Sequence, residues 1–124
     1  MPDTDEHRDP PGADDPGVTL INVVEMPADQ VDNFVADWKK RAEIMSTLPG
    51  FRDYALYRAL LPDSRFQLVN VAHWDSREAF EAAIANPEFL SQREAALHAI
   101  DFGVTASPAL YGVIASGQRW DRAN

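Results

Sequence analysis

The order of the apolar segments restricts the fold of this chain more than any other feature of its sequence. Runs rich in β-branched and aromatic residues, typical of strands, alternate with segments whose apolar residues recur at helical spacing. Strands are expected at 18–26, 51–60, 66–74 and 109–115, and helices at 29–48 and 76–100, the second interrupted at Asn86-Pro87. The order β-α-β-β-α-β predicts an α+β, ferredoxin-like fold, with a four-stranded antiparallel sheet that carries both helical regions on one face.

The expected strands are apolar on both sides. In 18–24 and again in 68–74, neither of the two alternating sets of residues is convincingly polar. Because helices cover only one face of such a sheet, the other face needs a partner, and an identical chain is the simplest one. We therefore expect a homodimer, with His73 packed at the dimer face because it alternates with Trp74.

Composition excludes several classes of function. The 124 residues carry a formal net charge of −9, which argues against a nucleic-acid partner. The absence of cysteine excludes disulfides, thiolate nucleophiles and cysteine-based metal centres. No apolar run approaches the roughly 18 residues of a membrane span, so we expect a cytoplasmic protein without a membrane partner.

The acidity is concentrated at the N-terminus. Residues 1–17 hold six acidic side chains, one arginine and four of the nine prolines, with nothing to bury, and are expected to form a disordered tail. A solubilising role is the simplest interpretation of this tail, and recruitment of a partner is the alternative. The folded domain is expected at 18–116, followed by a short C-terminal tail at 117–124.

The usual cofactor motifs are missing. No glycine belongs to a dinucleotide-binding or P-loop pattern, and no pair of histidines has the spacing of a metal site. No serine lies in a nucleophile-elbow pattern. We therefore expect neither a metal nor a bound cofactor.

Two asparagines interrupt apolar strands. Asn22 and Asn70 both belong to the alternating sets expected to face the helices, and Trp74 follows Asn70 by four residues on the same side. An amide in such a place costs roughly 1–3 kcal/mol unless it is hydrogen-bonded. Each asparagine could satisfy a helix end, a bulge or a neighbouring backbone group. Together with Trp74, however, the pair predicts a ligand pocket with apolar walls and a few converging polar groups.

Other residues are candidates for the walls of this pocket. Arg93 falls on the inward side of its helix, where it could extend to solvent or supply a cation to an enolate or phenolate. Four aromatic residues could contact a flat substrate, although each could equally be core: Phe34, Trp38, Tyr57 and Phe80.

Four segments carry a resemblance to a known family: the strand VTLINVVEM, the helix stop LPGF, the hairpin YRALLPDSRFQLVNVAHWDS and the helix opening EAFEAAIANPEF. Together they resemble the antibiotic biosynthesis monooxygenase family of dimeric α+β barrel proteins. The resemblance covers about residues 17–116. Within that family, the cofactor-independent anthrone oxygenases use an Asn in the first strand and an Asn-x-x-x-Trp in the third. Those positions match Asn22 and the segment from Asn70 to Trp74.

The resemblance implies oxidation of an anthrone- or naphthol-type polyketide by O2 to a quinone, with Asn22, Asn70 and Trp74 as catalytic residues. The haem-degrading branch uses a Trp and a His where this chain has Ala83 and Arg93, which speaks against haem as the substrate. Two alternatives stay open. One is oxidative C–C cleavage or rearrangement of an aromatic polyketide with reduced flavin as cosubstrate, and the other is a non-catalytic protein that binds a small aromatic or quinone.

Overall fold

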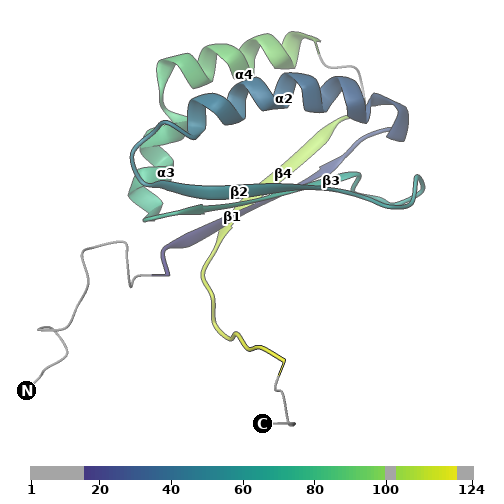
Figure 1. The fold of residues 1–124 in the computed structure, drawn as a ribbon. Helices are drawn as coiled ribbons and strands as arrows, with labels where there is room; N and C mark the ends of the chain where they lie inside the picture. The colour runs from purple at the N-terminus through teal and green to yellow at the C-terminus, as the bar shows by residue number, and fades with distance from the viewer. Residues whose placement is uncertain (1–15, 100–102, 120–124) are drawn as a thin grey trace, which may run out of the picture.

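The computed structural model describes residues 16–99 and 103–119, which form a four-stranded sheet with helices packed on one face (Figure 1). The elements are β1 (Val18–Glu25), the 3-10 turn η1 (Ala28–Gln30), α2 (Val31–Met45), β2 (Phe51–Arg58), β3 (Leu68–Trp74), α3 (Arg77–Ile84), α4 (Pro87–Ala99) and β4 (Thr105–Tyr111). The strands are antiparallel, in the order β2-β3-β1-β4. The α+β, ferredoxin-like fold expected from the sequence is confirmed.

Side-chain caps explain where α3 and α4 begin. Ser76 caps α3, since its hydroxyl accepts a hydrogen bond from the Ala79 amide at 3.0 Å. The side-chain oxygen of Asn86 accepts hydrogen bonds from the backbone amides of Glu88 and Phe89. Asn86 therefore separates α3 from α4 and caps the N-terminus of α4. The first helical region is shorter than expected, because it opens as a 3-10 turn and α2 ends at Met45.

The last strand begins earlier than the sequence predicted. β4 runs from Thr105 to Tyr111, whereas the expected strand covered 109–115 and left Pro108 outside. Pro108 instead lies inside the strand, opposite Asn22 of β1. A proline is tolerated here because β4 is an edge strand that pairs only with β1 and needs no hydrogen bonds on its outer side.

The apolar core between sheet and helices is split in two. One cluster of buried residues gathers where β1 ends and β3 begins and comprises Val24, Met26, Val31 and Leu68. The other lies toward the end of β3 and comprises Ala72, Trp74 and Ala83. The register pairs Val24 with Leu68 and Val18 with Trp74, so the two clusters occupy opposite ends of the β1–β3 pair. The middle of the sheet is therefore left for other side chains.

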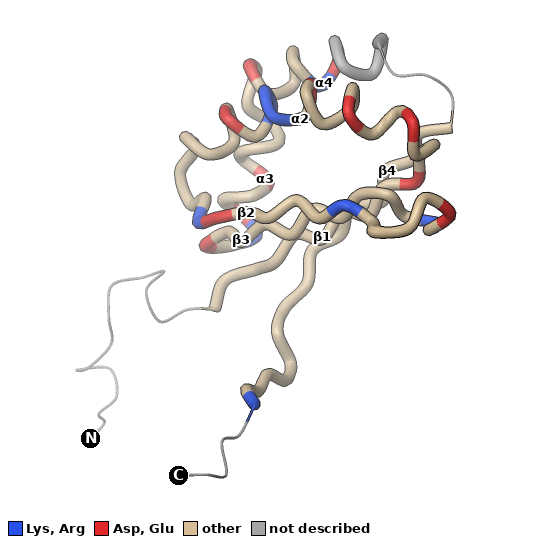
Figure 2. Tube along the Cα trace, turned by 45° about the vertical axis from the view of Figure 1, so that its right-hand side comes forward, with Lys and Arg blue, Asp and Glu red and all other residues tan. Residues whose placement is uncertain are grey.

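The face of the sheet opposite the helices has no cover within the described chain (Figure 1). Charged residues lie mainly on the helices and near the ends of the strands (Figure 2). The central strands present Ile21, Val23, Val69 and Val71 to this open face, where each is only partly buried. These four side chains form a continuous apolar centre of the open face.

The expected tails lie largely outside the described residues. Positions 1–15 and 120–124 are not described, and the boundaries of the folded domain at 18 and 116 stay predictions. Within the described parts of the chain, no helix combines the length and the apolar character needed to cross a membrane.

A glycine fixes the turn between α2 and β2. Gly50 has a positive φ of 86°, and a Cβ atom there would lie 2.4 Å from the Cβ of Ala79 on α3. Its carbonyl accepts a hydrogen bond of 2.7 Å from the Asp75 amide. Only glycine combines this backbone conformation with such a close approach. The turn therefore brings Phe51, the first residue of β2, opposite Trp74.

We predict that Gly50→Ala lowers the free energy of unfolding by about 2–4 kcal/mol, because it combines a left-handed backbone with a steric clash. Gly112→Ala is the matched control, since nothing lies within 4 Å of a Cβ at that position, and it should change stability by less than about 0.5 kcal/mol. Urea denaturation followed by circular dichroism measures both. Equal midpoints for the two variants would contradict the prediction.

Candidate active site

A cavity of about 950 Å³ lies between the helix-facing side of the sheet and the helices, with walls from all four strands and from α2, α3 and α4. Its size suits a polycyclic small molecule. A smaller cleft of about 360 Å³ between α2 and β2 is lined in part by Asp32, Lys39 and Arg58, and holds none of the residues that the sequence singled out. The larger cavity is therefore the candidate site.

The two asparagines face each other across the floor of this cavity. Asn22 of β1 and Asn70 of β3 are directly paired in the antiparallel register, and both line the cavity. Leu56 of β2 and Pro108 of β4 continue the same row on either side. The row crosses the sheet between the two apolar clusters, so the amides are the polar centre of an otherwise apolar floor.

Asn22 and Asn70 lack the structural partners that would explain them. Among the described residues, three buried side-chain atoms have no hydrogen-bond partner, and these are Oδ1 of Asn22, Oδ1 of Asn70 and Nε1 of Trp74. Each such atom costs free energy in the ligand-free protein. The alternative that each asparagine serves a helix end, a bulge or a nearby backbone group is not what the structure shows. The three residues predicted as catalytic are thus the three described residues that have a buried polar side-chain atom without a hydrogen-bond partner.

Trp74 is held rigidly by other aromatic rings. Its side chain is 1% exposed, and Phe51 and Phe80 each meet it edge to face, with ring centroids 5.2 and 5.9 Å away. Ala72 and Ala83 pack in the same cluster. This packing fixes the direction of the indole N–H, which preorganises it as a donor.

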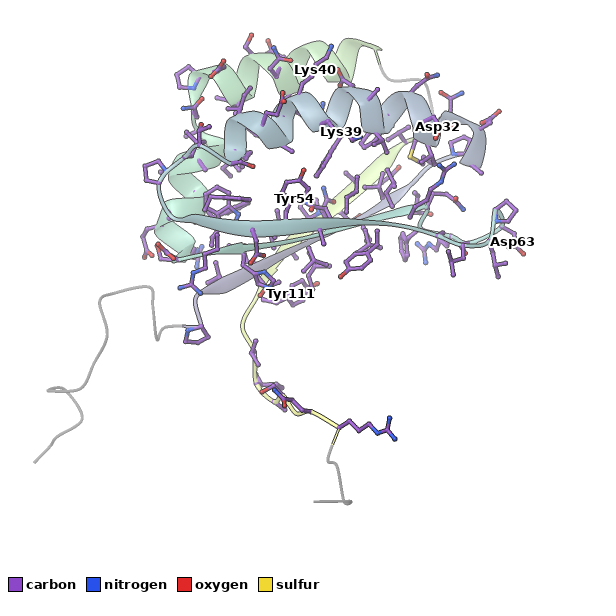
Figure 3. The ribbon with its side chains drawn as sticks, in the orientation of Figure 1. Asp32, Lys39, Lys40, Tyr54, Asp63 and Tyr111 are labelled. Carbon is purple, nitrogen blue, oxygen red and sulfur yellow. The ribbon has the colours of Figure 1, made fainter. Side chains whose placement is uncertain are left out.

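Further aromatic residues line the cavity from α2 and β2. Trp38 and Tyr54 form an edge-to-face pair with centroids 5.2 Å apart, and Tyr54 rises from β2 toward α2 (Figure 3). Phe34 also lines the cavity and packs against the cluster that contains Val24. Phe34, Trp38 and Phe80 therefore lie where the sequence placed them, and Tyr54 joins them.

Tyr57 does not reach the cavity, contrary to the expectation from the sequence. It is opposite Val69 on the open face of the sheet and is 58% exposed. The cause is a β-bulge between Phe51 and Asp53, which shifts the alternation of β2 by one residue. The bulge turns Tyr54 toward the helices and Tyr57 away from them.

Three arginines and one glutamate are the charged residues among the described cavity walls. Arg93 of α4 lines the cavity as expected, although its side chain is exposed. Arg77 of α3 pairs with Glu81 at 2.9 Å, and both are more than half exposed. The sequence interpretation missed Arg41 of α2, which lies three residues after Trp38 and seven after Phe34, on the apolar side of the helix.

His73 lies outside the cavity. His73 is on the open face, where its Nδ1 is 2.5 Å from Oδ1 of Asp53, and neither residue lines the cavity. Within the described residues, no group of three or more His, Cys, Asp or Glu side chains could hold a metal ion. His98 of α4 has no described side chain.

A comparison with known protein families gives a clear match. The model of the family described as "Antibiotic biosynthesis monooxygenase" matches residues 17–95. The chain belongs to this family. The match begins at the first strand, covers β1, β2, β3, α2 and α3, and reaches into α4, so it includes Asn22, Asn70 and Trp74.

Proteins similar to this chain include a heme oxygenase and a cofactor-independent oxygenase. A "Heme oxygenase (mycobilin-producing)" of Mycobacterium tuberculosis is 33% identical over 70 residues, which are 56% of this chain and 65% of that relative, so the match spans slightly less than two thirds of its length. SnoaB, a cofactor-independent oxygenase from Streptomyces nogalater, has a similar structure with a TM-score of 0.63 and 28% identity, over 80% of this chain and 94% of its own.

A third similar structure is that of MhuD, a heme-degrader from Mycobacterium tuberculosis with two hemes bound. Its TM-score is 0.60 at 26% identity, over 82% of this chain and 99% of its own. These similarities support an oxygenase within the antibiotic biosynthesis monooxygenase family and leave the substrate of this member to be decided from its own site.

We predict that Asn70→Leu raises the free energy of unfolding by about 1 kcal/mol, because it removes a buried, unpartnered amide. Gln67→Leu is the matched control from the same stretch of chain. Gln67 is 2% exposed, and its Nε2 donates to the carbonyls of Leu61, Pro62 and Ser64, at 2.8 Å for Ser64. Its loss should cost about 1–3 kcal/mol. Urea denaturation compares the two, and a clear loss of stability in Asn70→Leu would show that the amide has a structural role.

Proposed function

We propose that the protein is a cofactor-independent monooxygenase that oxidises an electron-rich polycyclic aromatic of the anthrone or naphthol type with O2 to a quinone. The observation that carries this proposal is the set of unpartnered polar atoms on Asn22, Asn70 and Trp74, all in one apolar cavity. In natural proteins such atoms are rare, and they often mark a catalytic role or a site that ordered water or a ligand occupies. SnoaB, a cofactor-independent oxygenase of similar fold, supports the assignment of chemistry.

The chemistry needs little from the protein beyond the right environment. Ground-state O2 is a triplet and reacts slowly with closed-shell molecules, whereas a delocalised carbanion transfers one electron to it and then recombines with the radical formed. Oxidation of an anthrone methylene places one oxygen atom in the new carbonyl and releases the other as water. The substrate therefore supplies all the electrons, and a protein needs only to hold the ring system, exclude water and stabilise the developing oxyanion.

The two amides and the indole divide these tasks. Asn22 and Asn70 are adjacent on the floor, so their amide groups reach the same part of a bound ring system. We assign them as partners of the substrate oxygen and of the peroxy intermediate, since a side-chain amide offers both N–H donors and a carbonyl acceptor. Trp74, four residues after Asn70 on the same strand, forms the wall and offers its indole N–H.

The cavity offers few candidates for a general base. Glu81 is the carboxylate among its described lining residues, and it is paired with Arg77. The described lining contains no histidine or aspartate. We therefore assign no side chain as the general base: an environment that stabilises the enolate lowers the pKa of the substrate, and the proton passes to solvent water before the ring system is enclosed.

Haem degradation is the second candidate, because a relative with 33% identity is named a heme oxygenase. The residues implied for that chemistry differ here. Ala83 stands where a Trp would be expected and is buried beside Trp74, and Arg93 stands where a His would be expected and lines the cavity. Titration with hemin distinguishes the candidates, since a stoichiometric Soret band followed by its loss on reduction in air would favour haem as the substrate.

For the oxygenase, we predict that Asn70→Ala lowers kcat for anthrone oxidation by about 100-fold or more, which is the usual effect of removing one preorganised partner of an oxyanion. Asn33→Ala, which removes an exposed asparagine of α2, is the control and should leave kcat unchanged. An oxygen electrode and the quinone absorbance measure turnover without added flavin, haem or metal.

Other results would favour the alternatives. Turnover that requires reduced flavin would favour flavin-dependent C–C cleavage or rearrangement. Saturable binding without oxygen uptake across a panel of phenols and anthrones would favour a non-catalytic binding protein. Equal rates for Asn70→Ala and the wild type would remove Asn70 from the mechanism.

We further propose that the protein is a homodimer whose two sheets pack through their open faces. The supporting observation is the central apolar patch of that face, formed by Ile21, Val23, Val69 and Val71. Its burial against an identical face would supply the cover that the helices supply on the other side. A cytoplasmic location, and the absence of nucleic-acid and membrane partners, stay predictions from the sequence.

Accordingly, we predict that Val71→Glu gives a monomer at micromolar concentration, because it places a charge at the centre of the proposed interface. Thr47→Glu, an exposed position at the end of α2, is the control and should leave the dimer intact. Sedimentation velocity measures both. A wild-type monomer at the same concentration would contradict the dimer.

A further inference from the structure

The charge of the cavity is opposite to that of the chain. The full sequence has a formal net charge of −9, whereas the described cavity walls carry Arg41, Arg77, Arg93 and a single carboxylate, Glu81. A cavity whose walls carry a net positive charge attracts anionic ligands. A cation-rich cavity in an acidic protein therefore indicates an anionic ligand.

Of the three arginines, Arg41 is the most enclosed. Its side chain is 12% exposed, whereas that of Arg77 is 72% exposed and Arg93 is also exposed. Its guanidinium carbon lies 5.8 Å from the centre of the Phe34 ring, which also lines the cavity. A charge in such a setting is screened far less by water and salt than one at the surface.

The guanidinium of Arg41 has spare capacity for a ligand. Its Nη1 donates to Oδ2 of Asp37, one helical turn earlier, at 2.7 Å, and this is the one polar contact recorded for it among the described residues. Asp37 is outside the cavity lining and is 40% exposed. Because a guanidinium carries five N–H groups in a fixed plane, one carboxylate leaves donors for a second anion.

We propose that Arg41 binds an oxyanion of the substrate, so that the cavity selects polycyclic aromatics that carry an ionised carboxylate or phenolate. Asp37 is the positioning residue that anchors the guanidinium against α2. This inference rests on the proposed function, since it names the substrate class of the same cavity. It adds a specificity-determining residue to Asn22, Asn70 and Trp74, which act on the oxygen chemistry.

The test compares two ligands of one shape, anthracene-9-carboxylate and the neutral 9-anthracenemethanol, by fluorescence titration of the full chain. The wild type should bind the carboxylate at least about tenfold more tightly, as expected for a charge-assisted pair away from water. Arg41→Gln should abolish this preference and leave binding of the alcohol within about twofold. Arg41→Lys should keep a preference of about threefold for the carboxylate, because lysine retains the positive charge but lacks the planar guanidinium.

The chain offers a closely matched control in Arg65. It also donates to a carboxylate, Glu25, and lies over a phenyl ring, that of Phe66, but it is 73% exposed and outside the cavity lining. Arg65→Gln should retain the full preference for the carboxylate.

Two results would overturn the proposal. A wild type that binds both ligands equally would show that the cavity does not select anions. A preference that persists in Arg41→Gln would show that another group is responsible. If the wild type bound neither ligand, the cavity would not be an aromatic-binding site, and the proposed function would fail with it.

Discussion

The antiparallel pairing of β1 with β3 is the constraint on which the rest of the site depends. Its register places Asn22 opposite Asn70 and Val18 opposite Trp74 on the face that meets the helices. Because side chains alternate along a strand, a slip of one residue would turn the asparagines and the tryptophan to the open face. The same pairing aligns Val24 with Leu68 at the far end, where both are buried in the first apolar cluster.

The division of the core into two clusters creates the cavity. Between them, the floor has two buried amide oxygens without a hydrogen-bond partner at its centre, and the helices supply both aromatic rings and arginines to the walls. A protein selected only for stability would fill such a space with apolar side chains. A ligand that donates to the two amide oxygens, as a hydroxyl does, and accepts from the indole N–H would recover the free energy that these atoms cost the empty protein.

Much of the fold and site could be predicted because it depends on local patterns. The alternation of apolar residues in 18–24 and 68–74 correctly placed Asn22, Asn70 and Trp74 on one face. Tyr57 and the last strand were misplaced for non-local reasons. The bulge near Phe51 shifts β2 by one residue, and the edge position of β4 allows Pro108 inside a strand. Neither a bulge nor an edge is visible in a pattern of residue types.

The sequence by itself determined the order of elements, the face on which the asparagines lie and membership of the family, because these follow from periodicity and from motifs that are contiguous in the chain. Only the tertiary structure decided that Asn22 and Asn70 are direct neighbours without partners, that Tyr54 replaces Tyr57 and that Arg41 is enclosed in the wall. The physical reason is that burial and hydrogen bonding depend on the whole packed environment of a side chain, which residues distant in sequence supply.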